Sequence, residues 1–243
     1  MQPDSELAAL IHAQHAAYDE DLPYWQDLVS HLPAPALELG CGSGRVLLPL
    51  AQQGHAVWGV DNDPQALALL KQAAGGLDLH LLEADFTTLN LSESFGLIYM
   101  PCNTYSTLDA AARARLLERV NSLLAAGGVF AASLPNPDVL ALLEDGEPEM
   151  EETFPLPDTG QPVQVLSEWR RGEGVLTIFW HYDCLQPDGR AVRHTATVHH
   201  QLTPAAALLA ELESAGFAVQ AWGDFDRHPF EPEAATLVFE ARR

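Results

Sequence analysis

Cysteine is scarce in this chain, and its scarcity excludes two classes of protein. The three cysteines, Cys41, Cys102 and Cys184, lie far apart and cannot all pair, which argues against a disulfide-stabilised secreted domain. None of them stands in a Cys-x-x-Cys or mixed Cys/His pattern of the kind that binds zinc. We therefore interpret them as buried free thiols and expect no metal site.

Basic side chains are also few. Against 34 aspartates and glutamates the chain has 12 lysines and arginines, which gives a formal net charge of -22. A protein that binds the phosphate backbone of a nucleic acid needs an excess of basic over acidic residues, so we expect no nucleic-acid partner. The acidity is compatible with a cationic or amine-bearing small molecule, although it also serves simply to keep a protein soluble.

Long hydrophobic runs and a signal sequence are missing as well. No apolar stretch reaches the length that spans a bilayer, so we expect no membrane partner. The first residues, 1–6, lack the basic start and apolar core of a signal peptide, which favours a cytoplasmic location. With 243 residues and 47% hydrophobic side chains, the chain suits one large domain or one domain with an elaboration.

A glycine-rich segment follows a short apolar run near the N-terminus. Residues 36–39 are apolar apart from Glu38, and Gly40, Gly42 and Gly44 then alternate with other residues before a helical pattern begins. Because glycine adopts positive φ and has no Cβ, such a segment lets the backbone turn sharply and approach a ligand closely. It predicts a strand-to-helix bend that holds a nucleotide-type cofactor.

Two residues of this segment decide between cofactors. The dinucleotide fingerprint requires a glycine where this chain has Arg45. Glu38 would repel a bound pyrophosphate, whereas it suits a ligand that carries ammonium and sulfonium charges. The segment matches the pattern E/D-x-G-x-G-x-G and resembles motif I of the class I S-adenosylmethionine-dependent methyltransferases. The resemblance extends from about Tyr18 to the C-terminus.

Strand and helix patterns alternate through the middle of the chain. Buried strands are predicted at 36–39, 56–60, 77–84, 95–100 and 129–134, with helices at 45–53, 65–74 and 108–124. This alternation predicts a parallel sheet with helices on both faces and a ligand at the carboxyl ends of the strands. Two last strands, 217–225 and 235–242, form a closing antiparallel hairpin, as in the family it resembles. We therefore predict an α/β fold with a Rossmann-like, seven-stranded, mostly parallel sheet.

An insertion interrupts this pattern after the fifth strand. Strands at 163–171, 175–185 and 190–202, separated by turn sequences, predict an antiparallel β-meander. The acidic stretch 144–152 is interpreted as a solvated loop in preference to a substrate-gating lid. The predicted organisation is a helical lid at 1–34, a cofactor-binding domain at 35–136 and 203–243, and the insertion at 137–202. The meander is expected to roof the substrate, contact a second subunit in a homodimer, or both.

The ends of the strands supply the expected cofactor contacts. Asp61 follows the second strand, where a carboxylate can accept both hydroxyls of a ribose, while Asn62 or Asp63 caps the next helix. Asp85 and Phe86 resemble the pair that contacts adenine in this family, with a simple turn carboxylate as the alternative for Asp85. The residues expected around the cofactor are Tyr18, Glu38, Gly40, Gly42, Gly44, Asp61, Asn62, Asp85, Phe86 and Met100. For Tyr18, packing within the lid remains an equal alternative.

The sequence after the fourth strand bears on the reaction. Residues 100–105 lack the D/N-P-P-Y/F motif of amino-methylating DNA enzymes and the aspartate of metal-dependent and aminopropyl-transferring relatives. By resemblance, this leaves metal-independent, in-line methyl transfer to a small molecule. The acceptor contacts we expect are Trp25, Asn103, Tyr105 and His181, and no catalytic residue is assigned.

The acceptor itself stays open at this level. The lid and the meander resemble those of amino-sugar N,N-dimethyltransferases, which favours N-methylation of an amine, while O- or C-methylation of a small metabolite would use the same motifs. Two alternatives belong to other classes: a NAD-dependent oxidoreductase, which Glu38 and Arg45 disfavour, and a non-catalytic S-adenosylmethionine-binding protein.

Overall fold

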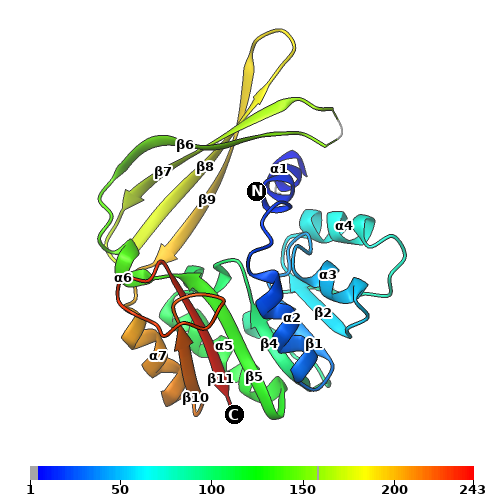
Figure 1. Ribbon diagram of the computed structural model, residues 1–243, viewed down its shortest axis with the longest axis vertical. Helices are drawn as coiled ribbons and strands as arrows, with labels where there is room; N and C mark the ends of the chain where they lie inside the picture. The colour runs from blue at the N-terminus through cyan, green and yellow to red at the C-terminus, as the bar shows by residue number, and fades with distance from the viewer. Residues whose placement is uncertain (1–4, 158) are drawn as a thin grey trace.

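The computed structural model describes residues 5–157 and 159–243 and contains two sheets (Figure 1). The larger sheet has seven strands in the order β10-β11-β5-β4-β1-β2-β3, and the smaller has four in the order β6-β7-β8-β9. Residues 1–4, which belong to the predicted lid and to the signal-peptide argument, and residue 158 of the predicted insertion lie outside the described residues.

The elements alternate as the sequence predicts. Two helices come first, α1 (Ser5–His15) and α2 (Leu22–His31). The larger domain then contains β1 (Ala36–Leu39), α3 (Leu47–Gln52), β2 (Val57–Asp61), α4 (Pro64–Ala73), β3 (His80–Glu83), η1 (Phe86–Thr88), β4 (Phe95–Met100), η2 (Thr104–Thr107), α5 (Ala110–Leu123), β5 (Leu124–Pro135), α6 (Pro137–Leu140), α7 (Ala205–Ser214), β10 (Ala218–Trp222) and β11 (Thr236–Arg242). The insertion contains β6 (Gly146–Pro155), β7 (Pro162–Arg171), β8 (Val175–Leu185) and β9 (Ala191–Gln201).

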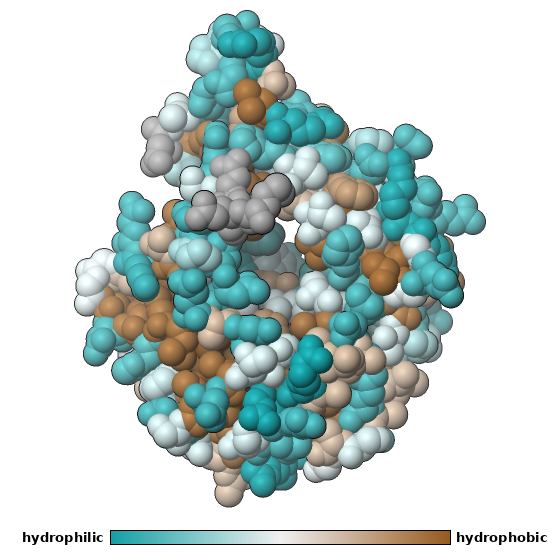
Figure 2. All heavy atoms as spheres, turned by 180° about the vertical axis from the view of Figure 1, so that it is seen from behind, coloured by the Kyte–Doolittle hydropathy of each residue, from teal (hydrophilic) through white to brown (hydrophobic). Residues whose placement is uncertain are grey.

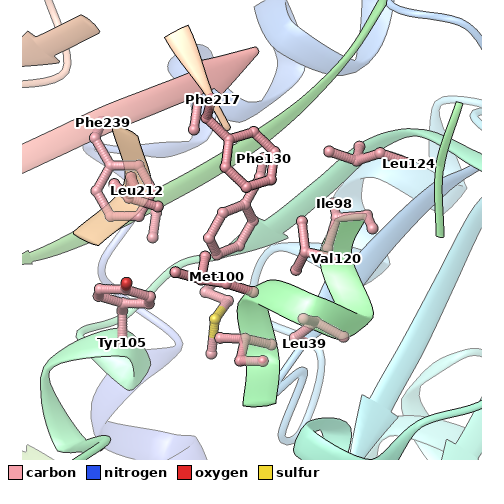
Figure 3. Packing of buried hydrophobic residues seen from close by; sticks show 14 of the residues in the cluster. Leu39, Ile98, Met100, Tyr105, Val120, Leu124, Phe130, Leu212, Phe217 and Phe239 are labelled. Carbon is pink, nitrogen blue, oxygen red and sulfur yellow. The ribbon is translucent and has the colours of Figure 1, made fainter. Parts of the chain in front are cut away.

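The pairing of the larger sheet confirms the predicted fold class. Strands β1 to β5 pair in parallel, whereas β11 is antiparallel to both β5 and β10. Every residue of β1 and β4 is buried, as expected of strands covered by helices on both faces. On one face of the sheet, Phe130 and Phe239 pack against Met100 and against residues of α5 and α7 (Figure 3).

Helix α1 lies beneath the smaller sheet and connects it to the larger domain (Figure 1). Its Leu10 packs in an apolar cluster with Val163, Val165 and Tyr182 of the sheet. The Tyr182 hydroxyl also donates a 2.6 Å hydrogen bond to the side-chain oxygen of Gln14. The face of the smaller sheet that carries Tyr182 therefore packs against α1, and we call it the inner face.

The acidic segment differs from the prediction. Residues 144–152 were expected to form a solvated loop, but most of them belong to β6, an edge strand paired antiparallel with β7. Its backbone groups pair with β7, so its many carboxylates stand at an exposed edge, where charge discourages pairing with another chain. The insertion is thus a four-stranded sheet in place of the predicted three-stranded meander.

Two smaller differences concern helix and strand ends. A helix was predicted at 108–124 and a strand at 129–134, but α5 ends at Leu123 and β5 already begins at Leu124, so the strand includes Gly127 and Gly128. Helix α3 begins at Leu47, two residues later than predicted, because a turn follows the glycine segment. Across residues 5–157 and 159–243, no helix combines the length and apolarity that crossing a membrane requires.

Candidate functional site

The glycine segment forms a tight loop between β1 and α3. Gly40, Gly42 and Gly44 all have positive φ, the conformation that glycine alone adopts without strain. A Cβ built on Gly44 would lie 2.2 Å from the side chain of Leu70 on α4, so at this position the loop also packs closely against α4. The positive φ values and the packing against α4 fix the backbone of this loop, which has no side chains at three positions.

Asp61 joins this loop to the end of β2. Its two carboxylate oxygens accept hydrogen bonds from the backbone N–H groups of Gly42, at 2.7 Å, and Asp63, at 2.8 Å. Burial raises the pKa of Asp61, and these hydrogen bonds oppose the rise. Asp63 caps α4 by accepting from the N–H of Gln65 at 2.8 Å, which confirms that one of the two following residues does the capping. Asp61 therefore faces the glycine loop.

Glu38 is a buried acid at the floor of the loop. Its side chain is 2% exposed, and its Oε2 has no hydrogen-bond partner among the described residues. Burial raises the pKa of Glu38 to about 8, against the opposing influence of Tyr99 and Arg45. An unsatisfied buried oxygen is costly, so it marks a position where a polar ligand group fits.

Three cavities lie side by side along the carboxyl ends of the strands. The first, of about 400 Å³, is lined by Asn62, Asp85 and Phe86, and it shares Gly40 and Asp61 with the second. The second, of about 220 Å³, lies between α1 and the glycine loop and contains Glu38 and Gly42. The third, of about 390 Å³, is lined by Tyr18, Asn103 and Glu152, among others. Figure 2 shows that the surface is hollowed where the smaller sheet meets the larger domain.

The second and third cavities meet at a cluster around Arg45. Its guanidinium forms a bidentate ion pair with Asp21, at 2.5 and 2.6 Å, and donates to the Cys102 sulfur at 2.7 and 3.2 Å. It also lies 4.9 Å from the centre of the Tyr18 ring, a cation–π contact. Cys102 and Asn103 both have positive φ, a strained conformation for cysteine that holds this turn against Arg45.

The structure brings together most of the predicted site residues. Those that line the three cavities are Tyr18, Glu38, Gly40, Gly42, Asp61, Asn62, Asp85, Phe86 and Asn103. Gly44 stands in the same loop beside them. The Asp85 Oδ1 accepts hydrogen bonds from the N–H and hydroxyl of Thr87, so this carboxylate is at least a turn residue, as the alternative interpretation held.

Four predicted contacts lie elsewhere. Met100 and Tyr105 are fully buried in the core, with Tyr105 packed against Phe130 and Phe239 (Figure 3). Trp25 is also fully buried and donates a hydrogen bond to Asp21 at 2.9 Å, so it lies behind Asp21 and does not line the cavities. His181 alternates with the inward-facing Tyr182 and bonds Thr195, which places it on the outer face of the smaller sheet, away from α1.

The cavities also contain residues that the sequence analysis did not assign. They are His15, Asp21, Arg45, Cys102 and Glu152. Arg45 had been noticed because it replaces a glycine, and this departure was the available signal for its role. Nothing in the local pattern of the other four indicates that α1, the lid loop, the turn after β4 and strand β6 converge.

The close packing of the glycine loop predicts a graded loss of stability. Gly44→Ala should lower the free energy of unfolding by at least about 2 kcal/mol, because positive φ costs alanine about 1–2 kcal/mol and overpacking against Leu70 adds to this. Gly54→Ala is the matched control, since Gly54 also has positive φ but its Cβ would meet nothing within 4 Å. Urea denaturation measures both. An equal loss in the two variants would contradict the packing argument.

Burial of Glu38 predicts a pH dependence of stability. Its folded pKa of about 8 exceeds the ordinary value of 4.5, so between these values the folded state holds a proton that the unfolded state has lost. The free energy of unfolding should therefore fall as pH rises from about 5 to 8. Thermal unfolding should show a shallower fall in Glu38→Gln than in the wild type or in Glu149→Gln, a control on the exposed edge of β6. Identical pH slopes in all three would contradict the assignment.

Comparisons with known proteins agree with this geometry. Residues 36–128 match the family model described as a methyltransferase domain. The chain is 27% identical over 183 residues to the cypemycin N-terminal methyltransferase of Streptomyces sp, covering 68% of this chain and 74% of that protein.

Solved structures share the fold over nearly the whole chain. An S-adenosylmethionine-dependent methyltransferase from Clostridium acetobutylicum ATCC 824 superposes with a TM-score of 0.81 at 16% identity, covering 98% of both chains. An S-adenosylmethionine-bound amino pentose methyltransferase from Micromonospora echinaspora gives a TM-score of 0.75 at 19% identity, covering 98% of this chain and 97% of that one. Residues 36–128 therefore match a methyltransferase domain, and the chain shares the fold of solved S-adenosylmethionine-dependent methyltransferases over nearly its whole length.

Proposed function

We propose that this enzyme transfers the methyl group of S-adenosylmethionine to an amine nitrogen of a small molecule, without a metal ion. The observation that carries the proposal is the order of the three cavities. A cofactor that filled the first two cavities, with adenine beside Phe86, would have its sulfonium methyl where the second cavity meets the third. The third cavity, of about 390 Å³, has the volume of a small-molecule site.

The residues of the first two cavities fit the cofactor. The glycine loop leaves room that any Cβ would reduce, and the unpartnered Glu38 Oε2 suits the cationic methionine end. Asp61 stands where it can accept the ribose hydroxyls while its backbone bonds keep it oriented. Asp85 uses Oδ1 for Thr87, which leaves Oδ2 for the adenine amino group beside Phe86.

The charges of the third cavity favour an amine. Asp21 is neutralised by Arg45, whereas Glu152 accepts a hydrogen bond from the neutral amide of Gln14 at 3.0 Å. The carboxylate of Glu152 is thus available to a cationic or hydrogen-bond-donating substrate group. Two of the relatives described above act, by their names, on an amino pentose and at the N-terminus of cypemycin. Both acceptor classes offer an amine.

The protein contributes the alignment of donor and acceptor. When bound, S-adenosylmethionine supplies an electrophilic methyl group on a sulfonium sulfur. The residues of the second and third cavities would hold the acceptor nitrogen within about 3 Å of that carbon, the general requirement for such a displacement. Helix α1 and the Arg45 cluster line the junction at which the donor and the acceptor would meet.

Turnover and binding together test this proposal. Calorimetry should first detect binding of S-adenosylhomocysteine, and mass spectrometry should then identify the methylated atom in a panel of an amino sugar, a dipeptide and a phenol. Glu152→Gln should raise KM for the methylated amine by about tenfold through loss of a charge-assisted hydrogen bond, with cofactor affinity unchanged. Glu149→Gln, exposed on the same strand, is the control.

Three results would contradict the proposal. Methylation confined to oxygen or carbon would exclude the amine acceptor. An unchanged KM in Glu152→Gln would remove its electrostatic basis. Binding of a nicotinamide dinucleotide in place of S-adenosylhomocysteine would contradict the cofactor assignment itself.

A further inference from the structure

Three residues line both the second and the third cavity, and they differ in what they can do chemically. They are His15, Arg45 and Cys102. Arg45 is a permanent cation tied to Asp21 and has no lone pair to offer. Cys102 receives two hydrogen bonds from Arg45, and burial raises the pKa of its thiol to about 11, so it is protonated at neutral pH. Of the three, His15 alone is a proton acceptor.

We propose that His15 accepts the proton that the acceptor nitrogen loses in methyl transfer, and that it is a catalytic residue of this enzyme. The proposal rests on the proposed function, because it places the transferred methyl group at the junction of the two cavities. It assigns a role to a residue that no sequence motif marks, at the last position of α1.

A contact of His12, one helical turn before His15, fixes the end of α1 at this junction. The Nδ1 atom of His12 lies 2.8 Å from the hydroxyl of Ser43 in the glycine loop, which anchors α1 to the cofactor cavity. Residues three apart lie on the same face of a helix, so His15 is directed to the same side. Glu152 and Gln14, bonded to each other, stand beside it in the third cavity.

The surroundings of His15 keep its ring neutral. Desolvation lowers its pKa from the ordinary 6.5, and the charges of Arg45 and His12 lower it further, while Glu152 opposes them. At pH 7 and above the ring is therefore ready to accept a proton. His15 is nevertheless an exposed residue, so a proton taken from the substrate can pass on to water.

The reaction balances with His15 in this role. The neutral amine uses its lone pair to form the nitrogen–carbon bond as the carbon–sulfur bond breaks, and that electron pair returns to sulfur. His15 accepts the N–H proton as positive charge develops on the nitrogen in the transition state, so the nitrogen regains a lone pair. The resulting imidazolium releases the proton to solvent, which restores the neutral ring for the next turnover.

Kinetics of a histidine variant test the role. His15→Gln should lower kcat by about 100-fold, the lower range for loss of a general base, while calorimetric affinity for S-adenosylhomocysteine stays within about twofold. The acid limb of the wild-type pH profile, where activity falls below pH 6.5 as His15 becomes protonated, should disappear in the variant. His31→Gln, exposed on α2, is the control and should retain the wild-type profile.

Chemical rescue separates catalysis from structure. Added imidazole should restore turnover by His15→Ala, and among substituted imidazoles the rate should follow the pKa of the added base. A structural defect would not respond in this way. These comparisons use whichever panel member is methylated, so methylation of a phenol would contradict the amine acceptor while leaving the His15 comparison intact, since a phenol must also lose a proton.

A titration that needs no acceptor completes the test. In the complex with S-adenosylhomocysteine, the ring proton resonance of His15, identified by its absence in His15→Gln, should titrate by NMR below 6.5. A midpoint above pH 7 would overturn the proposal, because the ring would then carry a proton at working pH. Retention of kcat within threefold in His15→Gln, or loss of kcat without rescue by imidazole, would overturn it as well.

Discussion

The ion pair between Arg45 and Asp21 connects the parts from which the site is assembled. Arg45 follows the glycine loop and Asp21 precedes α2, and their side chains are 10% and 1% exposed. Asp21 also accepts from Trp25, and Arg45 also donates to Cys102 at the turn after β4. Removing either partner would leave a buried charge unpaired. The pair therefore fixes the segment before α2, the glycine loop and the turn after β4 relative to one another. The meeting point of the second and third cavities depends on this pair.

The same region shows why a strongly acidic protein suits this cofactor. Glu38 and Asp61 line the second cavity, and burial raises the pKa of both, although the charge of Arg45 opposes the rise at Glu38. A ligand with ammonium and sulfonium groups reverses that penalty, because it supplies the opposite charge at close range. The glycine loop leaves space for the backbone to approach the ligand, and the acids supply negative charge opposite its cationic groups.

The larger sheet could be predicted from the sequence because its determinants are local. Buried apolar strands alternate with amphipathic helices, and glycines mark the bend at which the cofactor cavities begin. The contacts at strand ends, such as Asp61 and Asp85, follow from that order. Trp25, Tyr105 and His181 could not be placed in the same way, because their surroundings are set by packing between distant segments. An aromatic ring in a lid or near a strand end serves equally well as core.

Strand β6 also could not be predicted from its own sequence. Its acidic residues have the composition of a solvated loop, yet pairing with β7 fixes its backbone and brings Glu152 to the third cavity. Strand formation at an exposed edge depends on the neighbouring strand more than on the residue types it contains. The inner and outer faces of the smaller sheet could likewise be distinguished only when α1 was seen against one of them. The predicted subunit contact through this sheet stays a prediction.

The position of the cofactor sulfur tests the account most directly. A crystal structure of the complex with S-adenosylhomocysteine should place adenine beside Phe86 and the sulfur at the junction formed by His15, Arg45 and Cys102, facing the cavity that contains Glu152. A sulfur atom that faces away from that junction, or a cofactor bound outside the glycine loop, would contradict it.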